Sequence, residues 1–152
     1  MQKHKMIKSL TDIIILLVSA FLFLSAVYIY VSNRSGDMIL YSWLGVDYNN
    51  HFFEWIRDHS CRLAPWVKYN LPDGLWMLSF LLFMEGVWGN EKKLKWMFCV
   101  PIIVFAFIME ILQYNGCFPG TGDIIDIVFY IAAILLFLLL TNLKQKCYEK
   151  NN

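Results

Sequence analysis

Four long apolar runs constrain the fold of this chain more than any other feature of its sequence. They cover residues 13–31, 75–88, 97–109 and 124–140, and the charged residues within them are Glu85 and Asp126. A helix that spans a membrane needs about 20 predominantly apolar residues, or about 17 with help at its ends. The backbone must hydrogen-bond internally in lipid, so runs of this length predict helices. We predict four transmembrane helices, at residues 11–31, 72–89, 96–114 and 123–142.

The composition supports a membrane protein of one domain. Of the 152 residues, 59% are hydrophobic and 17% aromatic, whereas an ordinary soluble domain is about half apolar. A single soluble core of this length could not bury so much apolar surface. We therefore predict an all-α membrane protein in which residues 1–152 form one four-helix transmembrane bundle. The first run follows a basic start, as in a signal peptide, but it is longer than a signal core and lacks a following small-x-small site, so we predict a retained helix.

The placement of lysines predicts the orientation of the bundle. Lysines cluster before the first predicted helix, between the second and third, and after the fourth: Lys3, Lys5 and Lys8; Lys92, Lys93 and Lys95; Lys144, Lys146 and Lys150. Cytoplasmic loops of membrane proteins are enriched in lysine and arginine. We expect a multi-pass protein of the bacterial cytoplasmic (inner) membrane, with both termini in the cytoplasm and residues 32–70 outside. Glu85, near the inner end of the second helix, is expected to be interfacial and to reach Lys92 or Lys93.

The outer segment, residues 32–70, is long for a connection and is expected to hold structure of its own. Its stretch HFFEWIRDHSCRL, which begins at His51, has apolar residues at helical spacing with charged residues between them. This pattern predicts a short amphipathic helix that lies on the outer leaflet or caps the bundle. A second interfacial piece is predicted at MILYSWL, residues 38–44.

The outer segment also raises the questions of metal binding and of disulfides. The amphipathic stretch carries side chains that could be drawn as metal ligands: His51, Glu54, Asp58 and His59. A solvated helix face carries such residues by default, so we expect neither a metal nor a cofactor. Cys61 and Cys117 are both predicted outside, where a disulfide is allowed; two free thiols are the alternative.

Glu110 is the most unusual acid in the chain. It lies about 20 Å beyond Met97 at 1.5 Å per residue, which places it in the outer half of a hydrocarbon layer about 30 Å thick. A carboxylate at that depth must face the bundle interior, be partnered, or be protonated. Gln113 and Tyr114 follow at spacings that share a helix face with it, and both can donate a hydrogen bond.

Further acids flank the tight turn NGCFPGTGD, residues 115–123. Thr121 or Asp123 can cap the fourth helix, and Asp126 lies one turn further on the same face. Asp73 occupies the first turn of the second helix, where an acid suits the helix dipole. Because these helix ends meet on the outer side, we predict a polar cluster there that binds a ligand or partner: Asp73, Glu110, Gln113, Asp123 and Asp126.

The residues around this turn resemble the VanZ-like family of small bacterial membrane proteins. The family pattern is Glu-x-x-Gln at the end of one helix, a glycine-rich turn, and Asp-x-x-Asp entering the next; here it reads EILQ (110–113) and PGTGDIID (119–126). LPDGLW, which begins at Leu71, is similar to the start of the preceding helix in shorter members. Where some members carry Asn four residues after the second Asp, this chain has Tyr130, and it has Ala132 and Ala133 where some have two glycines. The founding member is linked to low-level resistance to the glycopeptide teicoplanin, a role that the resemblance alone does not carry to this chain.

Three functions are compatible with the predicted cluster. The first is a non-enzymatic envelope protein that binds an envelope lipid or peptide ligand, or docks a partner. The second is an enzyme acting on a lipid-linked or cell-wall precursor, with Glu110 as general acid or base and with Asp123 and Asp126 holding substrate or a divalent cation. The third is a proton-coupled transporter subunit, since acids in membranes often form relays.

We favour the first function, because the chain has no evident nucleophile–base pair and no phosphate loop. A hydrogen-bond network that only ties the helices together is the structural alternative to all three. We expect contacts with membrane lipid, allow for a homo-oligomer, and expect no nucleic acid partner.

Overall fold

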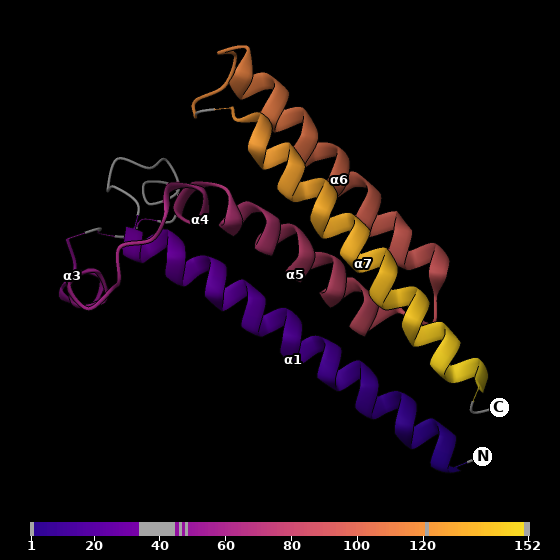
Figure 1. The fold of residues 1–152 in the computed structure, drawn as a ribbon. Helices are drawn as coiled ribbons and strands as arrows, with labels where there is room; N and C mark the ends of the chain where they lie inside the picture. The colour runs from indigo at the N-terminus through magenta and orange to yellow at the C-terminus, as the bar shows by residue number, and fades with distance from the viewer. Residues whose placement is uncertain (1, 34–44, 46, 48, 121, 151–152) are drawn as a thin grey trace.

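The regular structure of this chain is helical throughout the part that the computed structural model describes, residues 2–33, 45, 47, 49–120 and 122–150. Over those residues there are six helices and no strand: α1 (Gln2–Asn33), α3 (His51–Asp58), α4 (Pro65–Tyr69), α5 (Leu71–Trp88), α6 (Lys92–Tyr114) and α7 (Ile124–Lys150). The four long helices run alongside one another as a bundle (Figure 1). The predicted all-α class is therefore confirmed.

Three of these helices are long and apolar enough to cross a membrane. The spans are Leu10–Asn33 in α1, Lys92–Tyr114 in α6 and Ile124–Cys147 in α7. Their surfaces carry large exposed apolar side chains, including Phe21 (69% exposed), Phe105 (60%) and Leu135 (61%). Continuous apolar surface of this extent is stable against lipid rather than water. The chain is therefore an integral membrane protein with several passes.

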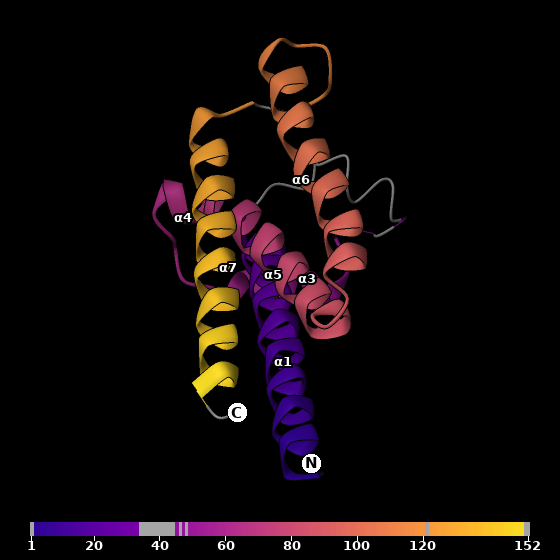
Figure 2. The same ribbon diagram turned by 90° about the vertical axis from the view of Figure 1, so that its right-hand side faces the viewer.

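Helix α5 corrects the prediction of four equivalent spans. It forms where the second span was predicted, but it is 18 residues long and is not among the three helices that qualify as spans. Pro72, Asp73 and Glu85 dilute its apolar content. It lies in contact with α1, α6 and α7 (Figures 1 and 2), and eight of its residues are buried. Protein rather than lipid covers much of this helix.

Three helix boundaries also differ from the prediction. α1 begins at Gln2 rather than at residue 11, α6 begins at Lys92 rather than at residue 96, and α7 continues to Lys150 rather than ending at residue 142. Lysine, glutamine and glutamate are good helix formers, so the helices continue past the apolar layer. The apolar runs therefore indicate which part of each helix suits lipid, but the helices themselves extend further.

The bundle has two chemically distinct ends. The end that carries both chain termini and the turn from α5 to α6 is here called the proximal end (Figures 1 and 2). The opposite, distal end carries α4, the start of α5 and the turn from α6 to α7 (Figure 1). The segments that carry the three lysine clusters therefore reach the proximal end.

The segment between α1 and α5 differs from the single amphipathic helix that was predicted. Two short helices, α3 and α4, lie in its described part, because Pro65 starts a new helix after the extended residues that follow α3. The second predicted interfacial piece, residues 38–44, lies outside the described residues.

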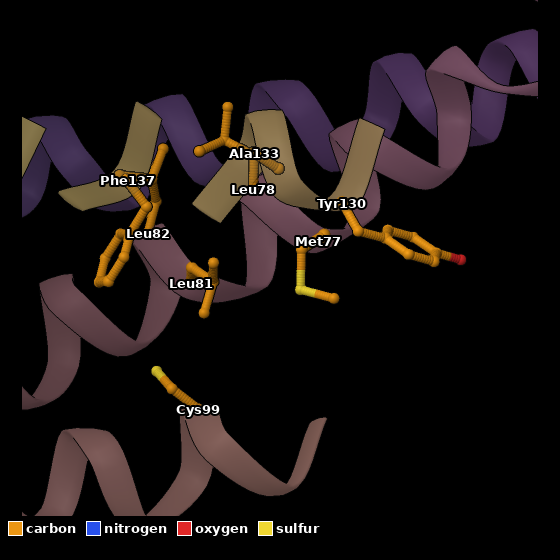
Figure 3. Close-up of a cluster of buried hydrophobic side chains, with 8 residues drawn as sticks. All are labelled: Met77, Leu78, Leu81, Leu82, Cys99, Tyr130, Ala133 and Phe137. Atoms are coloured by element: carbon orange, nitrogen blue, oxygen red, sulfur yellow. The ribbon is translucent and has the colours of Figure 1, made fainter. Parts of the chain in front are cut away.

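The apolar core lies where α5 meets α6 and α7. It comprises Met77, Leu78, Leu81 and Leu82 of α5, Cys99 of α6, and Tyr130, Ala133 and Phe137 of α7. Figure 3 shows the Tyr130 ring pointing away from Phe137, with its hydroxyl at the edge of the group. Tyr130 is the polar boundary of the core and leads to the candidate site.

Candidate functional site

Asn70 joins α4 to α5 and holds two carboxylates of α7. Its side chain is buried, at 3% exposed. The amide nitrogen donates to Asp126 Oδ1 at 2.8 Å and to Asp123 Oδ2 at 3.1 Å. An amide NH₂ group has two protons, so both hydrogen bonds can form together. One neutral side chain therefore connects the start of α5 to the start of α7.

Glu110 faces the same place from α6. It is buried, at 7% exposed, and its Oε2 accepts from the backbone N–H of Asp123 at 3.3 Å. The Tyr130 hydroxyl lies 3.5 Å from Oε1, a distance that makes a weak hydrogen bond. Of the alternatives for a carboxylate at this depth, Glu110 therefore lies inside the bundle and has hydrogen-bond partners. We call Asn70, Glu110, Asp123, Asp126 and Tyr130 the acid–amide cluster.

Asp123 has two roles in this cluster. Its Oδ1 accepts from the backbone N–H of Ile125 at 2.9 Å, and its carbonyl accepts from the N–H of Asp126 at 3.0 Å. These contacts cap α7 and confirm the predicted capping role. Its other oxygen, Oδ2, faces Asn70. Thr121, the alternative cap, lies outside the described residues.

The turn before Asp123 brings the end of α6 close to the start of α7. Gly116 and Gly120 adopt φ angles of 69° and 134°, a region that side chains with a Cβ rarely enter. Gln113 donates to the Pro119 carbonyl at 3.4 Å, and Tyr114 is 69% exposed. Both side chains are able to donate, but Gln113 uses its amide in the turn and Tyr114 is exposed.

Asp73 interacts with the cluster electrostatically. It is half-buried in the first turn of α5 and lies within electrostatic range of the Tyr130 hydroxyl. Asp126 and Asp123 interact in the same way with Glu110. Four of the five predicted site residues therefore lie around one end of the bundle, and Gln113, in the last turn of α6, bonds to the turn beside them.

Sequence reasoning missed Asn70 and Tyr130 as members of the cluster. Tyr130 lies one turn after Asp126 on the same face of α7, and this spacing was the available signal. Asn70 is the last residue of the predicted outer segment, where nothing in the sequence marks it. Its partners are more than 50 residues away in the chain, so no local pattern could have identified them.

A second polar group lies at the proximal end, and it corrects the expectation for Glu85. Glu85 does not pair with Lys92 or Lys93: its Oε2 lies 2.7 Å from Lys95 Nζ and its Oε1 lies 2.9 Å from Lys144 Nζ. Lys144 also contacts Asp12 Oδ1 at 2.7 Å. We call Asp12, Glu85, Lys95 and Lys144 the proximal ion cluster. Two acids and two bases balance its charge.

The remaining candidate ligands do not gather into a metal centre. In the described part of the chain, no three side chains of His, Cys, Asp or Glu are placed to hold an ion. His51 Nδ1 and Glu54 Oε2 form an exposed pair at 3.5 Å. Cys61 and Cys117 are exposed free thiols, which agrees with the second alternative for these residues.

The chemical character of the acid–amide cluster is that of an acceptor-rich site. Glu110 and Asp123 are held by neutral donors, namely backbone N–H groups, the Asn70 amide and the Tyr130 hydroxyl. Neither forms an ion pair with a described residue. Such a site can bind a cation or a group with several donors, and it can exchange a proton at Glu110. No protein-family model, curated protein or solved structure matches the chain.

Proposed function

We propose that this chain is a VanZ-like protein of the bacterial cytoplasmic membrane whose acid–amide cluster binds an envelope ligand from the outside. The observation that carries the proposal is the meeting of Glu110, Asp123 and Asp126 beside the Asn70 amide at the distal end. These residues come from α6, from α7 and from the junction of α4 with α5. An arrangement that converges from such separate segments is typical of a site.

The proposed orientation rests on the placement of the lysines and of the termini. Lys92 and Lys93 lie in the first turn of α6, at the proximal end, and both termini lie at that end as well. Cytoplasmic surfaces are richer in lysine than external ones. The proximal end therefore faces the cytoplasm, α5 crosses as a fourth pass inside the bundle, and the acid–amide cluster faces the cell envelope.

The chemistry of the cluster favours a ligand with a primary ammonium group. Glu110 is buried but has neutral partners, and a carboxylate in a low-dielectric site is stabilised by a nearby cation. Asp123 is half-buried, so it is accessible to a ligand that approaches from the distal surface. An ammonium group is carried by aminophospholipid headgroups and by envelope peptides, so both are sources of the same chemistry.

Native mass spectrometry of the detergent-solubilised chain tests this proposal. The two lipid probes are phosphatidylethanolamine, which carries the ammonium, and phosphatidylglycerol, which does not; a lysine-containing dipeptide tests the peptide source. We expect adducts with at least one ammonium probe, several-fold weaker adducts in Asp123→Asn, and unchanged adducts in Asp58→Asn. Asp58 is a matched control, because it is an exposed acid of the neighbouring α3 outside the cluster.

Other outcomes separate the alternatives. Equal adducts with both lipids in wild type and Asp123→Asn would reject ligand binding at this cluster. Chemical change of an added lipid, lost in Glu110→Gln, would indicate an enzyme with Glu110 as acid or base. Proton flux into vesicles, lost in the same variant, would indicate a transporter.

A further inference from the structure

The α3–α4 pair is a feature of the distal end that the acid–amide cluster does not explain. Neither helix has a buried residue. Their exposed surface is strongly aromatic, with Phe52 62% exposed, Trp55 60%, Trp66 55% and Tyr69 48%. Aromatic surface of this extent is uncommon where only water covers it.

The faces of α3 separate by polarity. At 100° per residue, Phe52, Trp55 and Ile56 project to one side, whereas Glu54 and Asp58 project to the other. Ile56 is half-buried, because α3 packs against α1, but Phe52 and Trp55 remain exposed. α1 therefore covers only part of the apolar face of α3, and the part formed by Phe52 and Trp55 stays exposed.

The attachment of α3 fixes its depth relative to the membrane. α3 packs against α1, and the Ser60 hydroxyl, just after α3, donates to the Arg57 carbonyl at 2.8 Å and lies 3.3 Å from the carbonyl of Ser32. Ser32 lies at the end of the span Leu10–Asn33. α3 is thus held at the level where the apolar layer ends, and headgroups of the same bilayer lie beside it.

Other aromatic residues lie on the helices that meet at this end. Trp66 of α4 stacks on Phe129 of α7, with ring centroids 6.4 Å apart and planes 20° apart. Trp76 of α5 packs edge-to-face on Phe23 of α1, with centroids 4.9 Å apart. Tryptophan and tyrosine concentrate at the headgroup level of membrane proteins. The exposed rings of α3 and α4 therefore continue a surface that already faces lipid.

From this geometry we infer that α3 and α4 lie in the headgroup layer of the leaflet at the distal end, with Phe52, Trp55 and Trp66 inserted among the lipids. A helix of this kind buries its apolar face about 5–10 Å into the interface. The occupant of the aromatic surface is phospholipid of the bilayer that α1, α6 and α7 cross. Because Asn70 is the C-cap of α4, the lipid contact also positions the amide that holds Asp123 and Asp126. The inference is independent of the ligand proposed above.

Spin-label accessibility in phospholipid vesicles tests the inference on the full chain. The exposed thiols Cys61, Cys117 and Cys147 are first replaced by serine, and the buried Cys99 is kept. Labels are then placed in Trp55→Cys and Glu54→Cys, with Phe105→Cys as the lipid reference and Glu91→Cys, an exposed position outside the spans, as the water reference. We expect the ratio of oxygen to nickel-complex relaxation to be several-fold higher at position 55 than at position 54, with position 54 close to the water reference.

Two outcomes would overturn the inference. One is an equal, water-like ratio at positions 54 and 55. The other is spin–spin broadening between labels at position 55, which would show that a second copy covers this surface. A native-residue measurement guards against a label that disturbs α3: Trp55→Phe should remove a fluorescence component that lipids brominated near the headgroup quench. Loss of an unquenched component would reject insertion.

Discussion

Lys95 donates to Glu85 at 2.7 Å, and the two side chains are only 5% and 6% exposed. Lys144 contacts the second oxygen of the same carboxylate, so Glu85 joins α5 to α6 and to α7. Asp12 adds α1 through Lys144. The four main helices are thus linked at the proximal end by one charge-balanced group, whereas the distal end is linked by neutral donors between acids.

Removing Glu85 should be strongly destabilising. In Glu85→Gln the ammonium of Lys95 remains buried without its counter-charge, and breaking a buried ion pair in this way costs about 3–5 kcal/mol. Thermal unfolding in detergent measures the loss. Glu91→Gln is the control, because Glu91 is an exposed acid in the adjacent turn, where we expect a change of about 0.5 kcal/mol or less. Equal melting temperatures for the two variants would show that the ion cluster does not stabilise the bundle.

The Asn70 amide should stabilise the bundle by donating hydrogen bonds rather than by filling space. Asn70→Ala removes hydrogen bonds to Asp123 and Asp126 and should cost about 1–3 kcal/mol. Asn70→Asp keeps the shape but places a third carboxylate against those two, so it should cost more than alanine. Asn115→Ala, which removes an exposed amide at the same end, should change stability little. Thermal unfolding gives the order of the variants, and an Asn70→Asp variant as stable as wild type would contradict the donor role.

Tyr130 should contribute through its ring far more than through its hydroxyl. The hydroxyl lies 3.5 Å from Glu110, so Tyr130→Phe should cost less than about 1 kcal/mol. The ring packs edge-to-face on Phe107 with centroids 5.9 Å apart, and Tyr130→Ala should cost about 3–5 kcal/mol by leaving a cavity. Chemical or thermal unfolding of the two variants compares these values. A large loss in Tyr130→Phe would assign the hydroxyl a greater role than its distance indicates.

Gly86 allows α1 to approach α5 closely. A Cβ at this position would lie 2.6 Å from Leu16 Cδ2, so Gly86→Ala should destabilise the bundle by about 1–3 kcal/mol through overpacking. Leu16→Ala alone leaves a void, but in the double variant the new methyl group occupies part of that space. A double-mutant cycle should therefore show the double variant to be more stable than the sum of the single changes. Additive losses would show that Leu16 is not the limiting contact.

The broad architecture was predictable because long apolar runs have few solutions in a membrane. The predicted helices at residues 11–31 and 96–114 fall within helices that qualify as spans, and so does the one at residues 123–142, except for its first residue, since a lipid environment leaves helix as the favoured backbone for a single apolar segment. The cap at Asp123 was also predictable, because glycines, a proline and an acid within a few residues are enough to indicate a turn followed by a helix start.

The partners across the bundle were not predictable in the same way. Which residues meet depends on how each helix is rotated about its axis, and packing of the whole bundle sets that rotation. At about 100° per residue, Lys92 lies about 60° from Lys95 around α6 and Lys93 lies on nearly the opposite face, so the partner of Glu85 depends on how α6 is rotated. Gln113 shares α6 with Glu110, but its side chain donates to the Pro119 carbonyl in the turn, a contact that the helix pattern alone does not indicate.

The central position of α5 has a consequence for biogenesis. A segment of 18 residues that contains Asp73 and Glu85 partitions poorly into a bilayer by itself, since an acid within a span opposes insertion by a few kcal/mol. Both lysines that neutralise Glu85 are synthesised after it, on α6 and α7. The burial of Glu85 in α5 therefore depends on the two later helices, α6 and α7, which supply both lysines.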